Sequence, residues 1–501
     1  MKSSSSTRGG TESGKAKRLL AGPFNRVEGD LEIELDVSDG RVISARVNAT
    51  MYRGFEQILQ GKAAHDALVY VPRICGICSV SQSVAAARAL ASLAGDIVIP
   101  PNGQHATNLI LATENLADHL THFYLFFMPD FCLPVYAPHA WHGEARRRFA
   151  SQTGEHARLA MAMRQRWLTL LGTLGGKWPH TQSIEPGGTA RAIDAAERVR
   201  LLSTVREFRS FLEHQFFAAP LEAVAGLDSE ASLWEWHAQA PMAGDFRLFL
   251  TMARDLGLGS LGRGPGVYLS YGAYPQPEGG WALSRGVWKG ERRMLDMLDL
   301  RGITEDSTHT WLFDAGEPLH PHAGVTKPDA EKASAYTWNK APRLHGDVVE
   351  TGAIARQLAS DHRLIRDAVA HHGGTVYTRM LARLLELARV VPMMETWLQA
   401  LRPTEAFCAP VRIPEEGHGA GLTEAARGSL GHWVVLRRGR IANYQIVAPT
   451  SWNFSPRDAR DVPGALEQAL VGVPVHAGEI NPVAVQHVVR SFDPCMVCTV
   501  H

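Results

Sequence analysis

Hydrophobic and polar residues alternate in two stretches of the chain, one near each end. The first, residues 31–49, alternates on both sides of Asp39-Gly40, and the second, residues 432–447, alternates on both sides of Arg438-Gly439. Alternation with a period of two is typical of a strand with one buried face, and a glycine-containing pair between two such runs is typical of a tight turn. We therefore predict a β-hairpin in each stretch.

Most other apolar residues recur at the helical spacing of three and four positions. In the longest such stretch, Tyr377, Met380 and Leu384 fall on one face. Residues 225–345 are richer in glycine, proline and tryptophan and have weaker periodicity, which favours an irregular peripheral layer. The predicted helices are residues 79–94, 104–127 (interrupted at Met128-Pro129), 155–174, 190–217, 350–372 and 375–401, with two short ones at 464–470 and 481–490.

This pattern predicts an α+β fold, with one large, helix-dominated unit over residues 19–501 and small β elements at its edges. Residues 1–18 are rich in serine, glycine and lysine and lack an apolar run, so we expect a disordered tail without a secretory signal. We find no apolar stretch that reaches the roughly 20 residues of a membrane span. These features favour a cytoplasmic protein.

The charge balance narrows the class of partner. Lys+Arg and Asp+Glu both number 51, so the formal net charge is zero with histidine neutral. A general nucleic-acid-binding protein needs a basic face, and this balance argues against nucleic acid as a partner. A neutral protein also has little net repulsion between molecules, which is compatible with a partner subunit.

Four of the six cysteines form two C-x-x-C pairs near opposite ends of the sequence, Cys75 with Cys78 and Cys495 with Cys498. Six cysteines in 501 residues are too few for a disulfide scaffold. Two such pairs can hold a structural zinc ion, and one pair can serve a thiol–disulfide oxidoreductase, although the small βαβ context of that class is missing. The third possibility is an iron–sulfur or mixed-metal redox centre buried between the two ends.

The residues around the two pairs resemble the signature motifs of the large subunit of nickel–iron (NiFe) hydrogenases. These two motifs are RICGIC at residues 73–78 and DPCMVCTVH at residues 493–501. Further blocks match the same family in the same order: RVEG at 26–29, RGFE at 53–56, LQG at 59–61, HFY at 122–124, KAPR at 340–343, EAARG at 424–428 and PTSWN at 449–453.

The resemblance implies that the four thiolates hold a Ni–Fe centre whose iron also carries one carbon monoxide and two cyanides. Cys75 and Cys495 match terminal nickel ligands, and Cys78 and Cys498 match the ligands that bridge nickel and iron. A terminal thiolate is basic, so it can accept a proton when H2 splits heterolytically. Glu28 matches the carboxylate that relays this proton away from Cys495, although it can also be a surface acid that caps the hairpin.

Further residues match groups around the metals. Arg427 matches the guanidinium above them, whose fixed donors suit cyanide nitrogens and a gas molecule. Thr450 is expected to donate to a cyanide. Asp118 and Asp493 match carboxylates beside Arg427, and they either take part in catalysis or only fix the arginine. Ala426 replaces the proline that is commoner in the family, so the roof of the pocket can differ.

The resemblance also implies a separate magnesium-type site and a partner. Glu56, the Ile446 carbonyl and the terminal His501 match the ligands of that site, which suits a hard cation and would fix the C-terminus. Cys132 and Cys408 are isolated and are expected to be plain buried thiols. Iron–sulfur clusters must then lie only in a partner, the hydrogenase small subunit.

Three functions share this family's fold. A quinone-reducing relative, such as the homologous subunit of respiratory complex I, is disfavoured because the four cysteines are retained. The residues Ser79–Gln82, with Ile77 and Phe126, resemble the regulatory H2-sensing group, and cyanobacterial-type and high-affinity uptake enzymes share these local features. A gene product that ends at His501 without a cleaved extension would be typical of the sensing group. We therefore expect an oxygen-tolerant H2 sensor that signals to a histidine kinase through the small subunit. The alternative is a high-affinity uptake hydrogenase that passes electrons to a respiratory acceptor.

Overall fold

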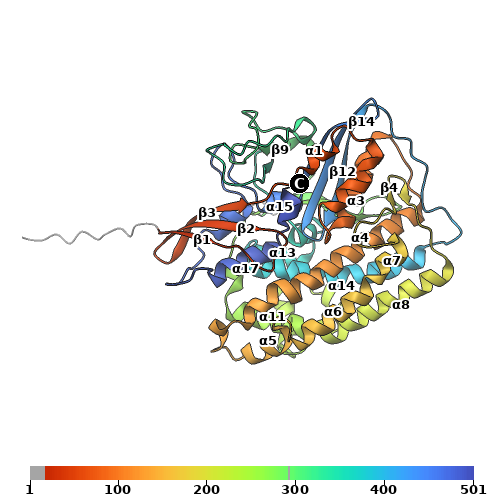
Figure 1. Cartoon of the computed structure of the whole chain (residues 1–501). Helices are drawn as coiled ribbons and strands as arrows, with labels where there is room; N and C mark the ends of the chain where they lie inside the picture. Colours follow the sequence, from red (N-terminus) through yellow and green to blue (C-terminus); the bar gives the residue numbers. More distant parts are fainter. Residues whose placement is uncertain (1–16, 291–293, 501) are drawn as a thin grey trace, which may run out of the picture.

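The computed structural model describes residues 17–290 and 294–500. Long helices fill the lower part of Figure 1, with strands β1 to β3 to the left and strands β12 and β14 above them. The helices are α1 Phe55–Leu59, α2 Ala67–Tyr70, α3 Ser79–Leu93, α4 Pro101–Thr121, α5 His142–Phe149, α6 Glu155–Trp167, α7 Thr169–Gly175, α8 Ala195–Phe211, α9 Leu221–Ala225, α10 Glu230–Ala238, α11 Gly244–Asp255, α12 Ala353–Ala359, α13 Arg363–His372, α14 Val376–Ala400, α15 Pro449–Asn453, α16 Ala465–Leu470, α17 Val483–Phe492 and α18 Met496–Thr499.

The strands form five sheets in the described part of the chain. Three strands each make up the sheets β1-β2-β3 and β12-β13-β14, four make up β11-β6-β7-β8, and β9/β10 and β4/β5 are two-stranded. The strands are β1 Lys17–Ala21, β2 Leu31–Ser38, β3 Arg41–Ala49, β4 Ile184–Glu185, β5 Gly188–Thr189, β6 Val267–Pro275, β7 Trp281–Lys289, β8 Met294–Asp296, β9 Ile303–Asp306, β10 Ala341–Leu344, β11 Glu350–Thr351, β12 Gly417–Ala425, β13 Gly428–Arg437 and β14 Arg440–Val447.

The two predicted hairpins are confirmed, and each gains a third strand. Asp39-Gly40 and Arg438-Gly439 all have positive φ, between 51° and 70°, as the tight turns of hairpins require. Strand β1 pairs antiparallel with β2, and β12 pairs antiparallel with β13. Because β1 begins at Lys17, the last two residues of the predicted tail belong to a strand, while residues 1–16 lie outside the described residues.

The longest helices, α4 and α14, pack against each other in the interior. Most residues of both helices are buried, which fits helices that are surrounded by protein on several sides. The chain continues from α4 as a π-helix over His122–Phe127, so the predicted helix at 104–127 is confirmed. None of the described helices combines the length and apolar character needed to cross a membrane.

Two expectations about local structure were wrong. Residues 225–345 are not an irregular layer, because β6 and β7 form the centre of a sheet and seven consecutive residues of β6 are buried. The stretch 350–372 is not one helix but a short strand followed by α12 and α13. The first break is at Gly352, with φ 131°, and the second is near Asp361, with φ 55°.

Strand β12 lies directly on helix α3 because its glycines leave no side chain between the two backbones. A Cβ atom at Gly421 would lie 1.9 Å from the Ala85 carbonyl oxygen and 2.2 Å from the Ala89 nitrogen. Gly419 meets the Ala89 oxygen in the same way, at 2.5 Å. This close contact fixes the sheet β12-β13-β14 against the helix that begins just after the first cysteine pair.

The two ends of the chain meet beside this helix. Glu28 forms a parallel bridge with Cys495, and its carbonyl accepts a hydrogen bond from the Met496 N–H at 2.7 Å. Farther along, the Arg53 N–H donates to the Val500 carbonyl at 2.9 Å. N-terminal segments therefore hold the C-terminal cysteine pair in position next to the first pair.

Candidate metal centre

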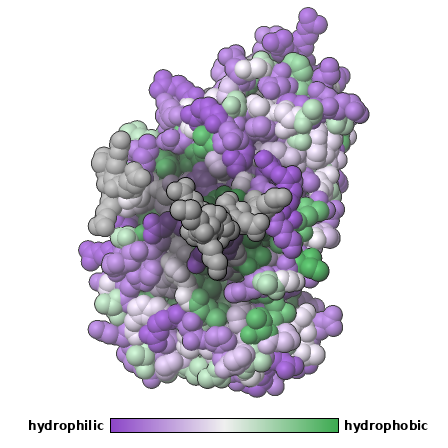
Figure 2. Space-filling view, turned by 90° about the vertical axis from the view of Figure 1, so that its left-hand side faces the viewer, coloured by the Kyte–Doolittle hydropathy of each residue, from purple (hydrophilic) through white to green (hydrophobic). Residues whose placement is uncertain are grey.

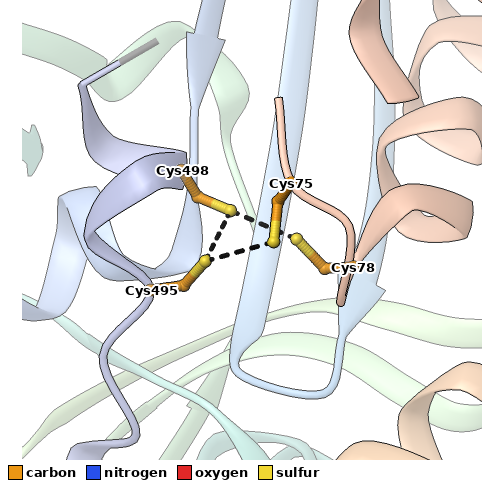
Figure 3. A group of neighbouring side chains, drawn as sticks. All are labelled: Cys75, Cys78, Cys495 and Cys498. Atoms are coloured by element: carbon orange, nitrogen blue, oxygen red, sulfur yellow. Dashed lines mark hydrogen bonds between the residues drawn. The ribbon is translucent and has the colours of Figure 1, made fainter. Parts of the chain in front are cut away.

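The structure brings the four paired cysteines together (Figure 3). Cys75 and Cys78 lie in the loop that leads into α3, whereas Cys495 and Cys498 lie at the start of α18. Their sulfur atoms are all within 4.8 Å of one another, with 3.5 Å between Cys75 and Cys495, 3.1 Å between Cys78 and Cys498, and 2.9 Å between Cys495 and Cys498. All four residues are buried, as the prediction of a four-thiolate site requires.

Four thiols this close together cannot all ionise easily, because each thiolate repels the next. Hydrogen bonds from the neighbouring thiols lower the pKa of Cys75 well below its usual value. The same hydrogen bonds and burial raise the pKa of Cys78 and Cys498 well above it. A metal cation resolves this conflict because it binds thiolates in place of protons.

Arg427 is the buried cation next to the thiols. Burial opposes its charge, but Asp118 and Asp493 keep the pKa of Arg427 well above its usual value. Its Nη1 lies 3.2 Å from Asp118 Oδ2, and its Nη2 lies 3.1 Å from Asp493 Oδ1. Both atoms nevertheless lack a well-directed hydrogen bond among the described residues, so they can donate to a further group.

The pKa values of the two aspartates beside Arg427 are shifted in opposite directions. Burial raises the pKa of Asp118 to about 7, although Arg427 favours its charged form. Burial acts on Asp493 in the same direction, but the Arg427 guanidinium holds its pKa below the usual range. Both carboxyls lie within 3.2 Å of the guanidinium, and the higher pKa makes Asp118 the more readily protonated of the two.

Glu28 and Thr450 both contact the backbone of Cys495. Burial and the negative charge of Cys75 raise the pKa of Glu28, which is partly exposed. Thr450 Oγ1 accepts a hydrogen bond from the Cys495 N–H at 3.0 Å. Its own O–H is therefore still available to donate, as the predicted contact with a cyanide needs.

Glu56 lies in a separate buried polar cluster. Its carboxylate accepts hydrogen bonds from the Ile446 N–H at 2.8 Å, the Lys340 ammonium at 3.2 Å and the Thr326 hydroxyl. Ile446 thus contacts Glu56 through its N–H. That its carbonyl oxygen binds a cation stays a prediction. His501, the third predicted ligand, lies outside the described residues.

The comparison with known proteins decides the family. A family model described as nickel-dependent hydrogenase matches residues 53–157 and 155–501. The chain belongs to this family. It is 28% identical to the Hydrogenase-2 large chain of Escherichia coli (strain K12) over 576 residues, covering 97% of each chain. It is 27% identical to the uptake hydrogenase large subunit of Rhodobacter capsulatus over 588 residues, covering 97% of this chain and 95% of the relative.

Solved structures give the same result. The Ni-Fe-Se hydrogenase from D. vulgaris Hildenborough superposes with a TM-score of 0.81 at 28% identity, covering 97% of this chain and 100% of that one. The predicted α+β fold of a hydrogenase large subunit is therefore confirmed. This hydrogenase chain carries cysteine at all four positions of its candidate metal centre.

Some residues around the hydrogenase site were missed in the sequence. Arg383 donates to Asp493 at 2.9 Å, and Glu386 of the same helix contacts His119 at 2.9 Å. Glu386 also accepts two hydrogen bonds from Arg356. A sequence signal existed, because charged residues at 379, 383 and 386 share one face of an otherwise largely apolar helix.

Four other sequence positions lie as follows. Cys132 and Cys408 are only partly buried, which corrects the expectation of buried thiols, and burial raises the pKa of Cys132 to about 12. Ile77 packs against the apolar cluster that contains the four cysteines. Phe126 is partly buried, and its ring meets the His122 ring edge-on at 6.5 Å.

Proposed function

We propose that this chain activates H2 as the large subunit of a NiFe hydrogenase, with the four thiolates holding a Ni–Fe centre whose iron carries one carbon monoxide and two cyanides. The observation that carries the proposal is the buried group of four sulfur atoms, brought together from two C-x-x-C pairs that lie 420 residues apart in the sequence. The two Arg427 Nη atoms add to the fit, because they lack a well-directed hydrogen bond to the neighbouring aspartates and can bind a cyanide nitrogen or a gas molecule.

The bound group would supply the redox-active Lewis acid that polarises H2. The chain supplies the acid–base groups. The Cys495 sulfur would take the proton, and Glu28, joined to Cys495 through the backbone, would pass it on. Asp118 and Asp493 would hold the guanidinium of Arg427 over the site, and the Thr450 hydroxyl would donate to a cyanide.

A magnesium-type cation near Glu56 is part of the proposal. The hard carboxylate oxygens of Glu56, together with His501 and the Ile446 carbonyl, would suit such a cation. Glu56 already pairs with Lys340. Because His501 is the last residue of the sequence, the cation would hold the C-terminus in place rather than take part in catalysis.

The partner in this proposal is a small subunit that carries the iron–sulfur clusters. Cys132 and Cys408 are too isolated to hold a cluster, so electrons must leave through another chain. Figure 2 shows apolar residues scattered among hydrophilic ones on one face of the molecule. A small subunit seated on the sheet β1-β2-β3 would bury exposed apolar side chains such as Leu20 on β1 and Ile43 on β3.

We further propose a regulatory role: a cytoplasmic, oxygen-tolerant H2 sensor that signals to a histidine kinase through the small subunit. The support is the resemblance of Ser79–Gln82, Ile77 and Phe126 to the H2-sensing group, and the high-affinity uptake enzymes share these local features. The second candidate is an energy-converting uptake enzyme, which the similarity to the R. capsulatus uptake subunit favours.

Isotope exchange tests the shared function. The complex of this chain with its small subunit should form HD from H2 in D2O. Cys495→Ser should abolish the exchange, and the control Cys132→Ser should keep it. Exchange that survives in Cys495→Ser would contradict the proposal.

A second assay separates the two roles. A sensor should oxidise H2 slowly and bind its kinase in the presence of the small subunit. Fast H2 oxidation that reduces quinone in membranes, without kinase binding, would instead establish the uptake role.

A further inference from the structure

Helix α3 begins directly after Cys78, and its start is held by a carboxylate from another helix. Cys78 occupies the N-cap position but its side chain makes no capping hydrogen bond. Glu114, on α4, accepts from the Val80 N–H at 2.8 Å and the Ser81 N–H at 2.9 Å. The first N–H groups of a helix have no partners within the helix, so Glu114 supplies a cap that the local sequence lacks.

The Glu114 carboxylate is also fixed from other directions. It accepts hydrogen bonds from the hydroxyls of Ser79 at 3.3 Å and Ser81 at 3.0 Å, and from the Trp178 indole at 3.0 Å. Glu114 is only 2% exposed. Five donors to one buried carboxylate leave it little freedom to move, and a negative charge is favourable at a helix N-terminus.

The first turn of α3 is tied in turn to Cys78. The Gln82 N–H donates to the Cys78 carbonyl at 3.2 Å, and the Gln82 side chain contacts His432 of β13 at 2.8 Å. The stretch Ser79–Gln82 is therefore anchored on one side to α4 and on the other to the sheet. Any shift of this turn would move the Cys78 sulfur.

Helix α4 carries a second residue that contacts the site, Asp118. Asp118 lies four residues after Glu114, so both carboxyls are on one face of the helix. Asp118 pairs with Arg427 at 3.2 Å. One helix face thus contacts both the turn after Cys78 and the guanidinium beside the thiols.

We propose that Glu114 is a positioning residue that sets the place of the Cys78 sulfur relative to the other three sulfurs, through the first turn of α3. The inference rests on the proposed Ni–Fe function, in which Cys78 binds the metals. Among the described residues, Glu114 hydrogen-bonds to Ser79, Val80, Ser81 and Trp178 and to none of the four cysteine sulfurs. Outer groups that orient metal ligands typically change metal affinity or activity by about 10- to 100-fold when they are lost.

Glu114→Gln tests this inference. Both carboxylate oxygens accept a backbone N–H, so the amide NH2 of glutamine must face a donor in either orientation. We expect about a 10- to 100-fold loss in nickel retention or in H/D exchange. The infrared bands of carbon monoxide and cyanide should also shift, because the position of Cys78 affects the iron.

Glu467→Gln is the matched control. Glu467 is also fully buried, and its two oxygens accept the backbone N–H groups of Val47 and Gly464 at 3.0 and 3.2 Å. It caps α16, and its hydrogen bonds are to Val47, Tyr336 and Gly464 rather than to the segments that carry the cysteines. A comparable loss of stability with unchanged infrared bands is expected, so a purely structural effect is distinguished from positioning of the ligand.

Ser81→Ala is a milder variant that removes one hydroxyl and keeps the backbone donors. The infrared bands of Ser81→Ala should shift in the same direction as those of Glu114→Gln. If the Glu114→Gln protein does not accumulate, the bands of Ser81→Ala alone test the inference. Bands identical to wild type in the folded variants, or an equal shift in Glu467→Gln, would overturn the inference. Absence of the bands from the wild-type complex would instead overturn the proposed function, and this inference with it.

Discussion

Glu28→Gln separates proton transfer from assembly of the metal site. The backbone contacts of Glu28 with the Cys495 segment, including the 2.7 Å bond from the Met496 N–H, do not involve the side chain. Glutamine has nearly the same shape but cannot ionise. We therefore expect normal metal content and normal infrared bands in the variant.

The expected loss of activity follows from the environment of Glu28. A lost acid–base group typically costs about 10²- to 10⁴-fold in rate. Because Glu28 is partly exposed, water can replace it in part as the proton acceptor. We therefore expect the rate of H/D exchange to fall at least about tenfold, which is below or at the low end of that range. That factor corresponds to about 1.4 kcal/mol in the activation free energy.

The assay is H/D exchange with solvent and H2 oxidation by the purified complex, with Glu32→Gln as the control. Glu32 lies on β2, where its contact is with Asn48 rather than with the cysteines. The control should exchange at the wild-type rate. Unchanged exchange in Glu28→Gln would refute the reasoning and leave Glu28 a structural residue.

Four further predictions follow from the same structure. Cys75→Ser should abolish H2 activation, because an alcohol does not bind nickel as a thiolate does, and wild-type exchange in the variant would exclude the ligand role. Replacing Ile77 with Val and Phe126 with Leu should widen gas access and make activity oxygen-sensitive; equal turnover in air and argon would show that they only pack. Gly421→Ala should lower the free energy of unfolding by about 1–3 kcal/mol or more in denaturant titrations, since its Cβ would lie 1.9 Å from a backbone oxygen; unchanged stability would contradict the close contact. Burial raises the pKa of Glu467 to about 6, so the contribution of Glu467 to the free energy of unfolding is full below about pH 4.5 and falls by about 2 kcal/mol as the pH rises through 6. Glu467→Gln should remove this pH dependence of stability. A pH profile of stability identical to that of the wild type would show that Glu467 does not titrate in this range.

The sequence predicted those parts of the fold in which local pattern and burial agree. The hairpins at Asp39-Gly40 and Arg438-Gly439 were predictable because strand alternation and turn chemistry indicate the same structure. Strand β12 was missed because its three glycines disfavour a strand, and they are needed only for the contact with α3. Strand β6 was missed because it is buried on both faces, so it shows no alternation.

The candidate site was predictable where the residues bind the metals themselves. The two C-x-x-C pairs carry a spacing that sequence shows directly. Glu114 and Arg383 could not be assigned, because each lies on a long helix and acts only through a residue distant in the sequence. Their roles appear when the structure places α4 and α14 beside the cysteines.

The central claim is that the four thiolates hold nickel and an iron with carbon monoxide and cyanide ligands. Infrared spectroscopy of the purified complex, with metal analysis of the same sample, tests it most directly. One nickel in each large subunit, one carbon monoxide band and two cyanide bands are expected. Zinc in place of nickel, with none of these bands, would contradict the account and indicate a structural zinc site.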